Sequence, residues 1–171
     1  IGRTIEESLL KAIRSLETGV CHIHNKKFDN METAEMLSYI TRGTDDRIYA
    51  IAELLRRGID RSLIYDRTKI DMLFLEKFKN IVRMERKVAQ NKGDRTTLLE
   101  AKRLGFGDKY IGQLWGMTEN EVFELRESMD IKPVFKIIDS CSGEFDRYIP
   151  YFYSTYESEN ESVVSDRKKI V

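Results

Sequence analysis

Residues that start and end helices recur along the first 130 residues of this chain. Thr4 and Glu7 have the Ser/Thr-x-x-Glu spacing of a capping box, in which two side chains accept hydrogen bonds from backbone N–H groups that the first helical turn leaves free. Thr118 and Glu121 repeat this spacing. Glycines follow several apolar periodic segments, and glycine readily takes the left-handed conformation that closes a helix. The sequence therefore predicts a fold of short, well-delimited helices.

Apolar residues repeat at helical spacing between these signals. The longest predicted helix runs from Thr68 or Ile70 to about Gln90, and we expect it to be central because apolar residues cover more than one of its faces. The other expected helices cover residues 4–19, 30–41, 45–58, 96–104, 108–114 and 118–128, with a single turn after Asp60. The core positions expected in the first two helices are Ile5, Leu9, Ala12, Ile13, Leu16, Met31, Ala34, Leu37 and Ile40.

The composition changes from Ile131 onward. Pro133 is poorly tolerated inside a helix, and residues 134–138 and 148–156 are rich in aromatic and β-branched side chains, which is typical of extended chain. Residues 157–162 are polar and have nothing to bury. We therefore predict a mainly α fold, a multihelical orthogonal bundle with a short extended C-terminal segment, over residues 1–156, and a linker over residues 157–171.

Charge and cysteine content narrow the classes of function. Lys and Arg together number 29 and so do Asp and Glu, so no net field attracts the whole chain to nucleic acid or to an anionic membrane. Cys21 and Cys141 are too few for a disulfide scaffold, which favours a reduced, cytoplasmic location. No apolar run approaches the roughly 18 residues of a membrane-spanning helix. The chain starts at Ile1 and ends in an apolar run, and we expect it to be a fragment of a longer protein.

Cys21, His22 and His24 are the one group of soft metal ligands close together in the sequence. A closed zinc site needs four ligands, and the other cysteine, Cys141, lies far along the chain. We therefore interpret this segment as a surface loop between two helices. No metal site is predicted.

Carboxylates at helix starts, namely Asp45, Asp46 and Asp71, are the other candidates for acid–base chemistry. Negative side chains are favourable at helix N-termini in any protein, so we interpret these three as caps. The sequence contains no glycine-rich phosphate loop and no nucleophile elbow. No catalytic, cofactor-binding or metal-binding residue is predicted, and a free-standing helical enzyme is disfavoured.

Residues 110–128 have the pattern of a helix-turn-helix DNA-binding motif, and a helical DNA-binding module is the alternative function. The second helix carries four glutamates, Glu119, Glu121, Glu124 and Glu127, against Arg126 alone. DNA phosphates would repel such a helix, which disfavours this alternative. The basic run of residues 83–92 is most simply a solvated helix face, although docking of an acidic partner stays open.

The chain resembles the helical oligomerisation (connection) domain that joins the two synthetase halves of the large chain of carbamoyl-phosphate synthetase. The resemblance covers nearly all of residues 2–157. The motifs that carry it lie at residues 2–17, 46–52, 80–85, 105–108, 133–136, 139–141, 144–145, 150–151 and 153–157.

This resemblance implies a non-catalytic domain. The parent would be an ATP-dependent ligase that makes carbamoyl phosphate from bicarbonate, glutamine-derived ammonia and two molecules of ATP, for pyrimidine and arginine biosynthesis. ATP and magnesium or manganese would bind the synthetase halves and not this domain. Its expected partners are those halves, with self-association as a further option, and the glutaminase small subunit is reached only through the parent. Neither nucleic acid nor a membrane is an expected partner. The predicted docking residues are Phe145, Tyr151, Phe152, Tyr153 and Tyr156.

Overall fold

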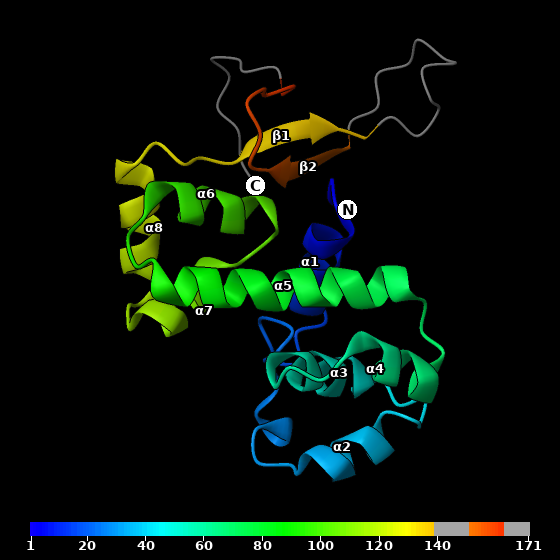
Figure 1. Cartoon of the computed structure of the whole chain (residues 1–171). Helices are drawn as coiled ribbons and strands as arrows, with labels where there is room; N and C mark the ends of the chain where they lie inside the picture. Colours follow the sequence, from blue (N-terminus) through cyan, green and yellow to red (C-terminus); the bar gives the residue numbers. More distant parts are fainter. Residues whose placement is uncertain (139–150, 163–171) are drawn as a thin grey trace, which may run out of the picture.

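The computed structural model describes residues 1–138 and 151–162. This part of the chain contains eight α-helices, one short 3₁₀ helix and a two-stranded sheet (Figure 1). The helices are α1 (Ile5–Ser15), η1 (Lys26–Phe28), α2 (Thr33–Tyr39), α3 (Arg47–Arg56), α4 (Arg61–Thr68), α5 (Met72–Gln90), α6 (Arg95–Arg103), α7 (Asp108–Trp115) and α8 (Glu119–Ser128). The strands are β1 (Val134–Ile137) and β2 (Phe152–Thr155). The predicted mainly α fold is confirmed.

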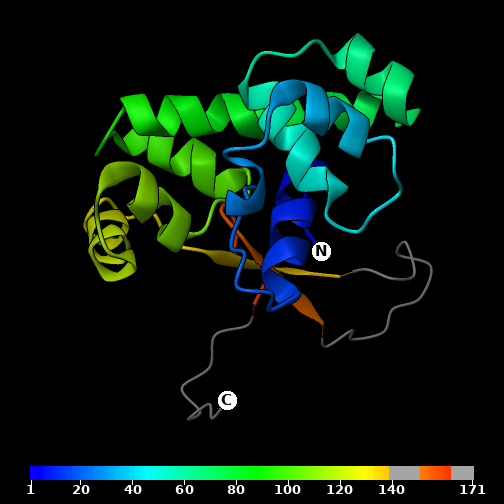
Figure 2. The same cartoon turned by 90° about the horizontal axis from the view of Figure 1, so that it is seen from below.

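Helix α5 is the centre of the bundle. It contacts α1, α3, α4, α6 and α7. In Figure 1 it spans the molecule horizontally, and α1 crosses it at a steep angle, as the turned view in Figure 2 also shows. Its buried apolar side chains are Leu75, Phe78, Ile81, Val82 and Val88. The prediction that this helix is central and packs on more than one face is confirmed.

Capping side chains fix most helix starts where the sequence placed them. Thr118 and Glu121 form a complete capping box at α8. At α1 the Thr4 hydroxyl accepts from the Glu7 N–H at 3.1 Å, but the Glu7 carboxylate accepts from the Arg3 N–H at 2.7 Å instead of closing the box. Each cap stabilises its helix by about 1 kcal/mol, so caps set boundaries while packing holds the bundle together.

The predicted core face of α1 is partly wrong. Ile5 is 38% exposed and Leu16 63% exposed, whereas Glu6 and Glu7 are almost fully buried with Leu10 and Ile13. The buried carboxylates are compensated: Glu6 accepts a hydrogen bond from Asn80 at 2.9 Å, and Glu7 pairs with Lys11 at 2.8 Å. Burial of a charge is tolerated where such partners exist.

Other boundaries differ from the predictions by a few residues. Helix α2 starts at Thr33, three residues later than expected, and Ala34 is exposed while Met36 is buried. The expected single turn after Asp60 is the eight-residue helix α4. Leu16, not Gly19, caps the end of α1, and Glu17 takes the left-handed conformation just after it.

The two strands pair antiparallel, with Phe135 opposite Ser154 and Lys136 opposite Tyr153. Residues 148–150 of the second predicted extended segment lie outside the described residues. Lys136 and Thr155 are buried on the inner face of the sheet, which lies beside α1 (Figure 2). Phe135 and Ile137 are exposed on the outer face.

Residues 157–162 of the predicted linker make hydrogen bonds to β1. Asn160 Oδ1 accepts from the Phe135 N–H at 3.0 Å, and the Glu161 N–H donates to the Phe135 carbonyl at 2.8 Å. The Glu161 carboxylate accepts from the Ile137 N–H at 2.7 Å. The start of this polar segment is therefore bound to the sheet, and the domain boundary after Tyr156 stays a prediction.

Candidate functional site

An apolar groove lies between α1 and the first turns of α5. It has a volume of about 550 Å³ and is lined by the apolar residues Ile5, Leu9, Phe74 and Phe78 together with Gly2, Arg3, Thr4 and Ser8. We call this surface the α1–α5 groove. Ile5 is the first residue of α1, directly after the N-cap Thr4. Phe74 and Phe78 share a face of α5 because they are four residues apart.

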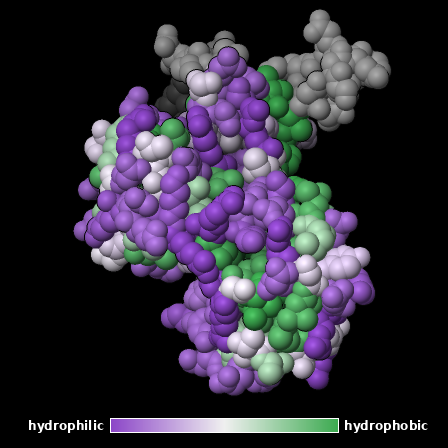
Figure 3. All heavy atoms as spheres, in the orientation of Figure 1, coloured by the Kyte–Doolittle hydropathy of each residue, from purple (hydrophilic) through white to green (hydrophobic). Residues whose placement is uncertain are grey.

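Large apolar side chains at this groove remain open to solvent. Phe74 is 46% exposed, and the neighbouring Met72 and Leu73 are also exposed. Figure 3 shows hydrophobic atoms along the right-hand side of the visible face, past the start of α5 and most broadly below it, where α3 and α4 lie in Figure 1. Contiguous exposed apolar surface of this kind marks sites of association.

The predicted docking residues do not behave alike. Phe145 lies outside the described residues. Tyr151 is 66% exposed, and Phe152 and Tyr153 are half-buried. Tyr156 packs against the core with the Lys102 ammonium 5.0 Å from its ring centre, and burial raises its pKa to about 12. The described members with the most open surface are therefore at the start of β2.

A buried polar cluster joins four segments of the chain. His22, in the loop after α1, has its Nε2 3.0 Å from Glu85 Oε1 on α5. Arg56, at the end of α3, donates to both Glu85 oxygens at 2.7 and 2.8 Å. The ring of Tyr110 on α7 stacks on His22 at a centroid distance of 3.7 Å. We call His22, Arg56, Glu85 and Tyr110 the buried cluster.

The charges in this cluster follow from its geometry. Burial would raise the pKa of Glu85, but the hydrogen bonds from Arg56 and His22 outweigh burial and lower it to about 2. Burial lowers the pKa of His22 despite the bond to Glu85. A neutral His22 beside an ionised carboxylate must carry its proton on Nε2, because that carboxylate can only accept. Nδ1 is therefore an unprotonated acceptor.

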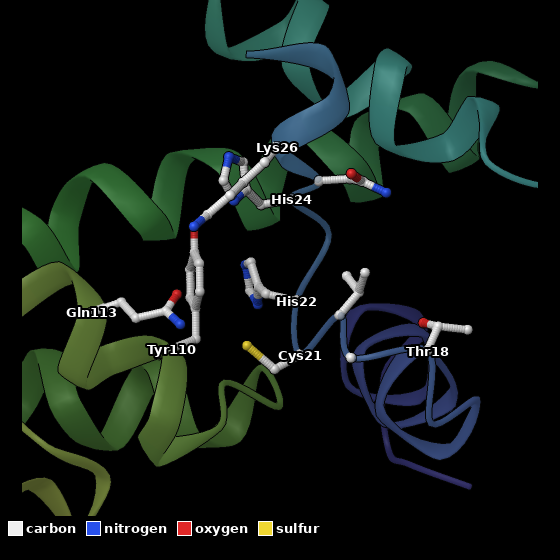
Figure 4. Close-up of a pocket in the computed structure, with 10 residues that line it drawn as sticks. Thr18, Cys21, His22, His24, Lys26, Tyr110 and Gln113 are labelled. Atoms are coloured by element: carbon white, nitrogen blue, oxygen red, sulfur yellow. The ribbon is translucent and has the colours of Figure 1, made fainter.

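A cavity of about 300 Å³ opens beside His22 (Figure 4). Its lining residues include Cys21, Tyr110, Gln113, Thr18 and Lys26. His22 Nδ1 is buried and has no hydrogen-bond partner among the described residues.

The interpretation of residues 21–24 as a surface loop is wrong for His22, which is 1% exposed. It is buried because its partner Glu85 lies 63 residues away on the central helix, and no local sequence pattern reveals that pairing. His24 pairs locally with Asp29 at 2.8 Å. Within the described ranges, no three His, Cys, Asp or Glu side chains are grouped so that they could hold a metal ion.

Two of the three candidate carboxylates, Asp71 and Asp46, have different contacts. Asp71 caps α5 through the Leu73 N–H at 2.8 Å, as predicted. Asp46 precedes α3 but accepts from Tyr39 and Lys27, each at 2.6 Å, instead of from the helix backbone. They lie on different helix starts and have no acid–base partner in common among their described contacts.

The basic run on α5 is largely engaged inside the domain. Arg83 donates to Asn80, Arg86 to the Arg56 carbonyl, and Lys92 to the Trp115 carbonyl. Lys87 pairs with Glu100 on α6. Only Lys87 is thus paired with a carboxylate, whereas Arg83, Arg86 and Lys92 donate to neutral oxygens and keep their positive charge at the surface, so docking of an acidic partner stays open.

The candidate DNA-binding motif is a tight pair of helices. A Cβ on Gly112 would lie 2.5 Å from the Met117 carbonyl, and Gly116 is left-handed, so the turn between α7 and α8 depends on both glycines. Arg126, the one basic residue of α8, is buried and donates to Asp108 at 2.9 Å. It is thus not available to phosphates, and nothing supports the DNA-binding alternative.

Comparison with known protein families gives one match over most of the chain. The family described as carbamoyl-phosphate synthetase large chain, oligomerisation domain, matches residues 1–130. This span includes every α-helix of the described residues and both helices of the groove. It ends just before the sheet. Separately, none of the described helices is both long enough and apolar enough to cross a membrane.

Proposed function

Because this chain belongs to the carbamoyl-phosphate synthetase large chain oligomerisation-domain family, we propose that it joins two copies of the large chain through the α1–α5 groove. One observation carries the proposal: Ile5 and Phe74, on two crossing helices, expose apolar surface over a groove that nothing else in the described chain fills. A second copy, related by a two-fold axis, presents the same surface in return.

The composition of the groove suits such a contact. Its lining combines four apolar side chains with Arg3, Thr4 and Ser8, and protein interfaces likewise combine apolar and polar residues. Burial of apolar surface favours association, and two-fold symmetry makes each favourable contact twice. Phe74 combines a large area with few rotatable bonds and is the expected anchor.

The outer face of the sheet is proposed to contact the synthetase halves of the same large chain. Phe135 and Ile137 on β1 and Phe152 on β2 lie on that face, and Tyr151 is exposed beside it. This surface follows the matched helical span, where the chain leads toward the second half in the implied order of the parent.

The chemistry of the parent belongs, on this proposal, to those halves. ATP and magnesium or manganese bind there, the glutaminase small subunit reaches this domain only through them, and the domain works in the cytoplasm. The closed hydrogen-bonding of the charged side chains along α5 and α8 is consistent with a structural role.

Sedimentation velocity of the chain tests the groove. We expect Ile5→Ser with Phe74→Ser to shift a concentration-dependent dimer to monomer and to weaken dimerisation about tenfold or more, with an unchanged circular dichroism spectrum. Phe123→Ser, a similarly exposed phenylalanine on α8, is the matched control and should leave association unchanged. Equal association of both variants would contradict the proposal.

The sheet contact is tested separately in the full large chain. Tyr151→Ser with Phe152→Ser should increase protease cleavage between this domain and the halves while leaving dimerisation intact. If these two substitutions abolish dimerisation and the groove substitutions do not, the two assignments are the wrong way round.

A further inference from the structure

A cavity separate from the one beside His22 lies where the sheet meets the helices. It has a volume of about 210 Å³ and is lined by residues of α1, of α6 and the loop after it, and of β2. Lys11, Arg14 and Lys102 bring three positive charges to its lining, and Glu7 is the one carboxylate that the described chain contributes to it. A small cavity lined mainly by charges of one sign attracts an ion of the opposite sign. The composition of this lining therefore favours an anion.

The charged ends of the three basic side chains lie at the cavity wall. Each donates to a carbonyl oxygen of another residue that lines the cavity: Lys11 to Ser154, Arg14 to Gly105 at 2.7 Å, and Lys102 to Phe106 at 2.9 Å. Because these acceptors belong to the wall, the ammonium and guanidinium groups lie there too, and not only their apolar stems. The three positive charges therefore act on the same small space.

Arg14 is the basic residue with donors left for an anion. Its guanidinium uses Nη1 for the neutral Gly105 carbonyl, and the side chain is half-buried and not sealed from solvent. Within residues 1–138 and 151–162, no carboxylate forms an ion pair with Arg14, and its Nε and Nη2 donate no hydrogen bond. These two nitrogens form a fork that matches two oxygens of a phosphate or carboxylate group.

The other two basic residues keep the cavity positive although they have acidic partners. Lys11 pairs with Glu7 at 2.8 Å. Lys102 pairs with Asp108 at 2.7 Å, but Asp108 is shared with Arg126 at 2.9 Å, so one carboxylate serves two cations. Burial lowers the pKa of both Arg14 and Lys102, and the nearby carboxylates do not restore it. An anion in the cavity offsets this cost of burying positive charge.

We propose that this cavity binds a small dianionic oxyanion, such as inorganic phosphate, on Nε and Nη2 of Arg14 and in the field of Lys11 and Lys102. A volume of about 210 Å³ is below the range of about 300–1,000 Å³ for ordinary small-molecule sites, so the cavity suits a tetrahedral ion and not a nucleotide. The site is separate from the α1–α5 groove, and this inference does not depend on the proposed function.

Titration of the chain with inorganic phosphate tests the site, with sodium chloride keeping the ionic strength constant so that general screening does not change. The Nε–H resonance of Arg14 in ¹H–¹⁵N spectra is the readout, because this group is a proposed donor to the ion. We expect a saturable shift of that resonance with phosphate and with sulfate. Acetate, which carries a single charge, should bind at least about tenfold more weakly.

Substitutions of Arg14 separate the guanidinium fork from its charge. Arg14→Met should abolish phosphate binding measured by calorimetry. Arg14→Lys retains the charge without the fork and should weaken binding about tenfold. Arg42→Met is the matched control, because it removes an exposed arginine outside the cavity, and it should leave the phosphate affinity unchanged.

Four outcomes would overturn the proposal. If Arg42→Met weakens binding as much as Arg14→Met, phosphate responds only to the net charge of the chain. If acetate binds as tightly as phosphate, the cavity does not select a dianion. If the Arg14 resonance shows no saturable shift, the cavity is closed to added anions. Arg14→Lys decides the matter if Arg14→Met does not fold, because an affinity equal to that of the unchanged chain would exclude a role for the fork.

Discussion

The buried cluster and the α1–α5 groove both contain residues of α5, but the two regions differ in polarity and in exposure to solvent. The cluster is polar and closed, with His22 and Glu85 almost without exposure, and its contacts join segments far apart in the sequence. The groove is apolar and open, with Ile5 and Phe74 exposed. The buried cluster stabilises the single chain, and the groove is the surface that we propose for a second chain.

Because of this difference, substitutions in the two regions should change different properties of the chain. A buried charge that loses its partner cannot be hydrated again, so change in the cluster reduces folding stability. An exposed apolar side chain contributes little to the stability of the single chain, so change in the groove affects association. Substitutions in the buried cluster should therefore change the unfolding free energy more than substitutions in the groove.

Glu85→Gln is expected to have the largest effect. It removes the nearer of the two carboxylates that pair with Arg56 and leaves only Glu53 at 3.3 Å, which costs about 3 kcal/mol of unfolding free energy. Urea denaturation measures this loss. Glu100→Gln, which breaks an exposed pair with Lys87, should change stability by less than about 1 kcal/mol, and equal losses would show that the buried cluster is not special.

Acid should destabilise the chain in two steps. His22 has a lowered pKa when folded, so below its ordinary pKa of 6.5 the unfolded chain binds the extra proton and stability falls. Glu85, with a folded pKa of about 2 against an ordinary 4.5, stabilises the chain above pH 4.5, and this contribution is lost as the pH falls toward about 2. That difference corresponds to about 3 kcal/mol. Stability that is constant from pH 7 to pH 3 would exclude both assignments.

His22→Phe should have an intermediate effect. It retains the aromatic contact with Tyr110 but removes one hydrogen bond to Glu85, at a cost of about 2 kcal/mol. It should also abolish the first acid step, since no group in the cluster then titrates near pH 6.5. Denaturation at pH 7 and pH 5.5 measures both effects. If the unfolding free energy of the variant falls between these two pH values as much as that of the unchanged chain, the first acid step belongs to another group.

Ile5→Ser with Phe74→Ser should have the smallest effect on unfolding, within about 0.5 kcal/mol at concentrations where the chain is monomeric. Its effect belongs to association, as described for sedimentation. A loss of several kcal/mol in the monomer would mean that the groove is part of the folding core, which would remove the contrast between the two regions.

The helices could be predicted from the sequence because their signals are local. Thr118 with Glu121, and Asp71 before Leu73, act within one turn, and the structure shows both contacts. The core face of α1 could not be predicted in the same way. Glu6 is buried because Asn80, on a helix far along the chain, supplies a donor, and periodicity records only which residues are apolar.

The two candidate sites differ in the same respect. Tyr151 and Phe152 were identified because aromatic residues concentrate in one short segment, while the α1–α5 groove was missed because its two halves come from separate helices. The exposure of Ile5 could not be predicted either, because it accompanies the burial of Glu6 and Glu7. Those two glutamates are buried only because they have partners. The role of His22 likewise depends on Glu85 and is not visible in the sequence around it.

The hydrogen bonds from Asn160 and Glu161 to β1 have a consequence for solubility. Open strand edges are templates for uncontrolled strand addition, the contact that builds fibrils. Here a side-chain amide, a carboxylate and one backbone N–H occupy the Phe135 and Ile137 groups that a foreign strand would need. Residues 160–161 thereby protect this edge of β1 from the addition of a foreign strand.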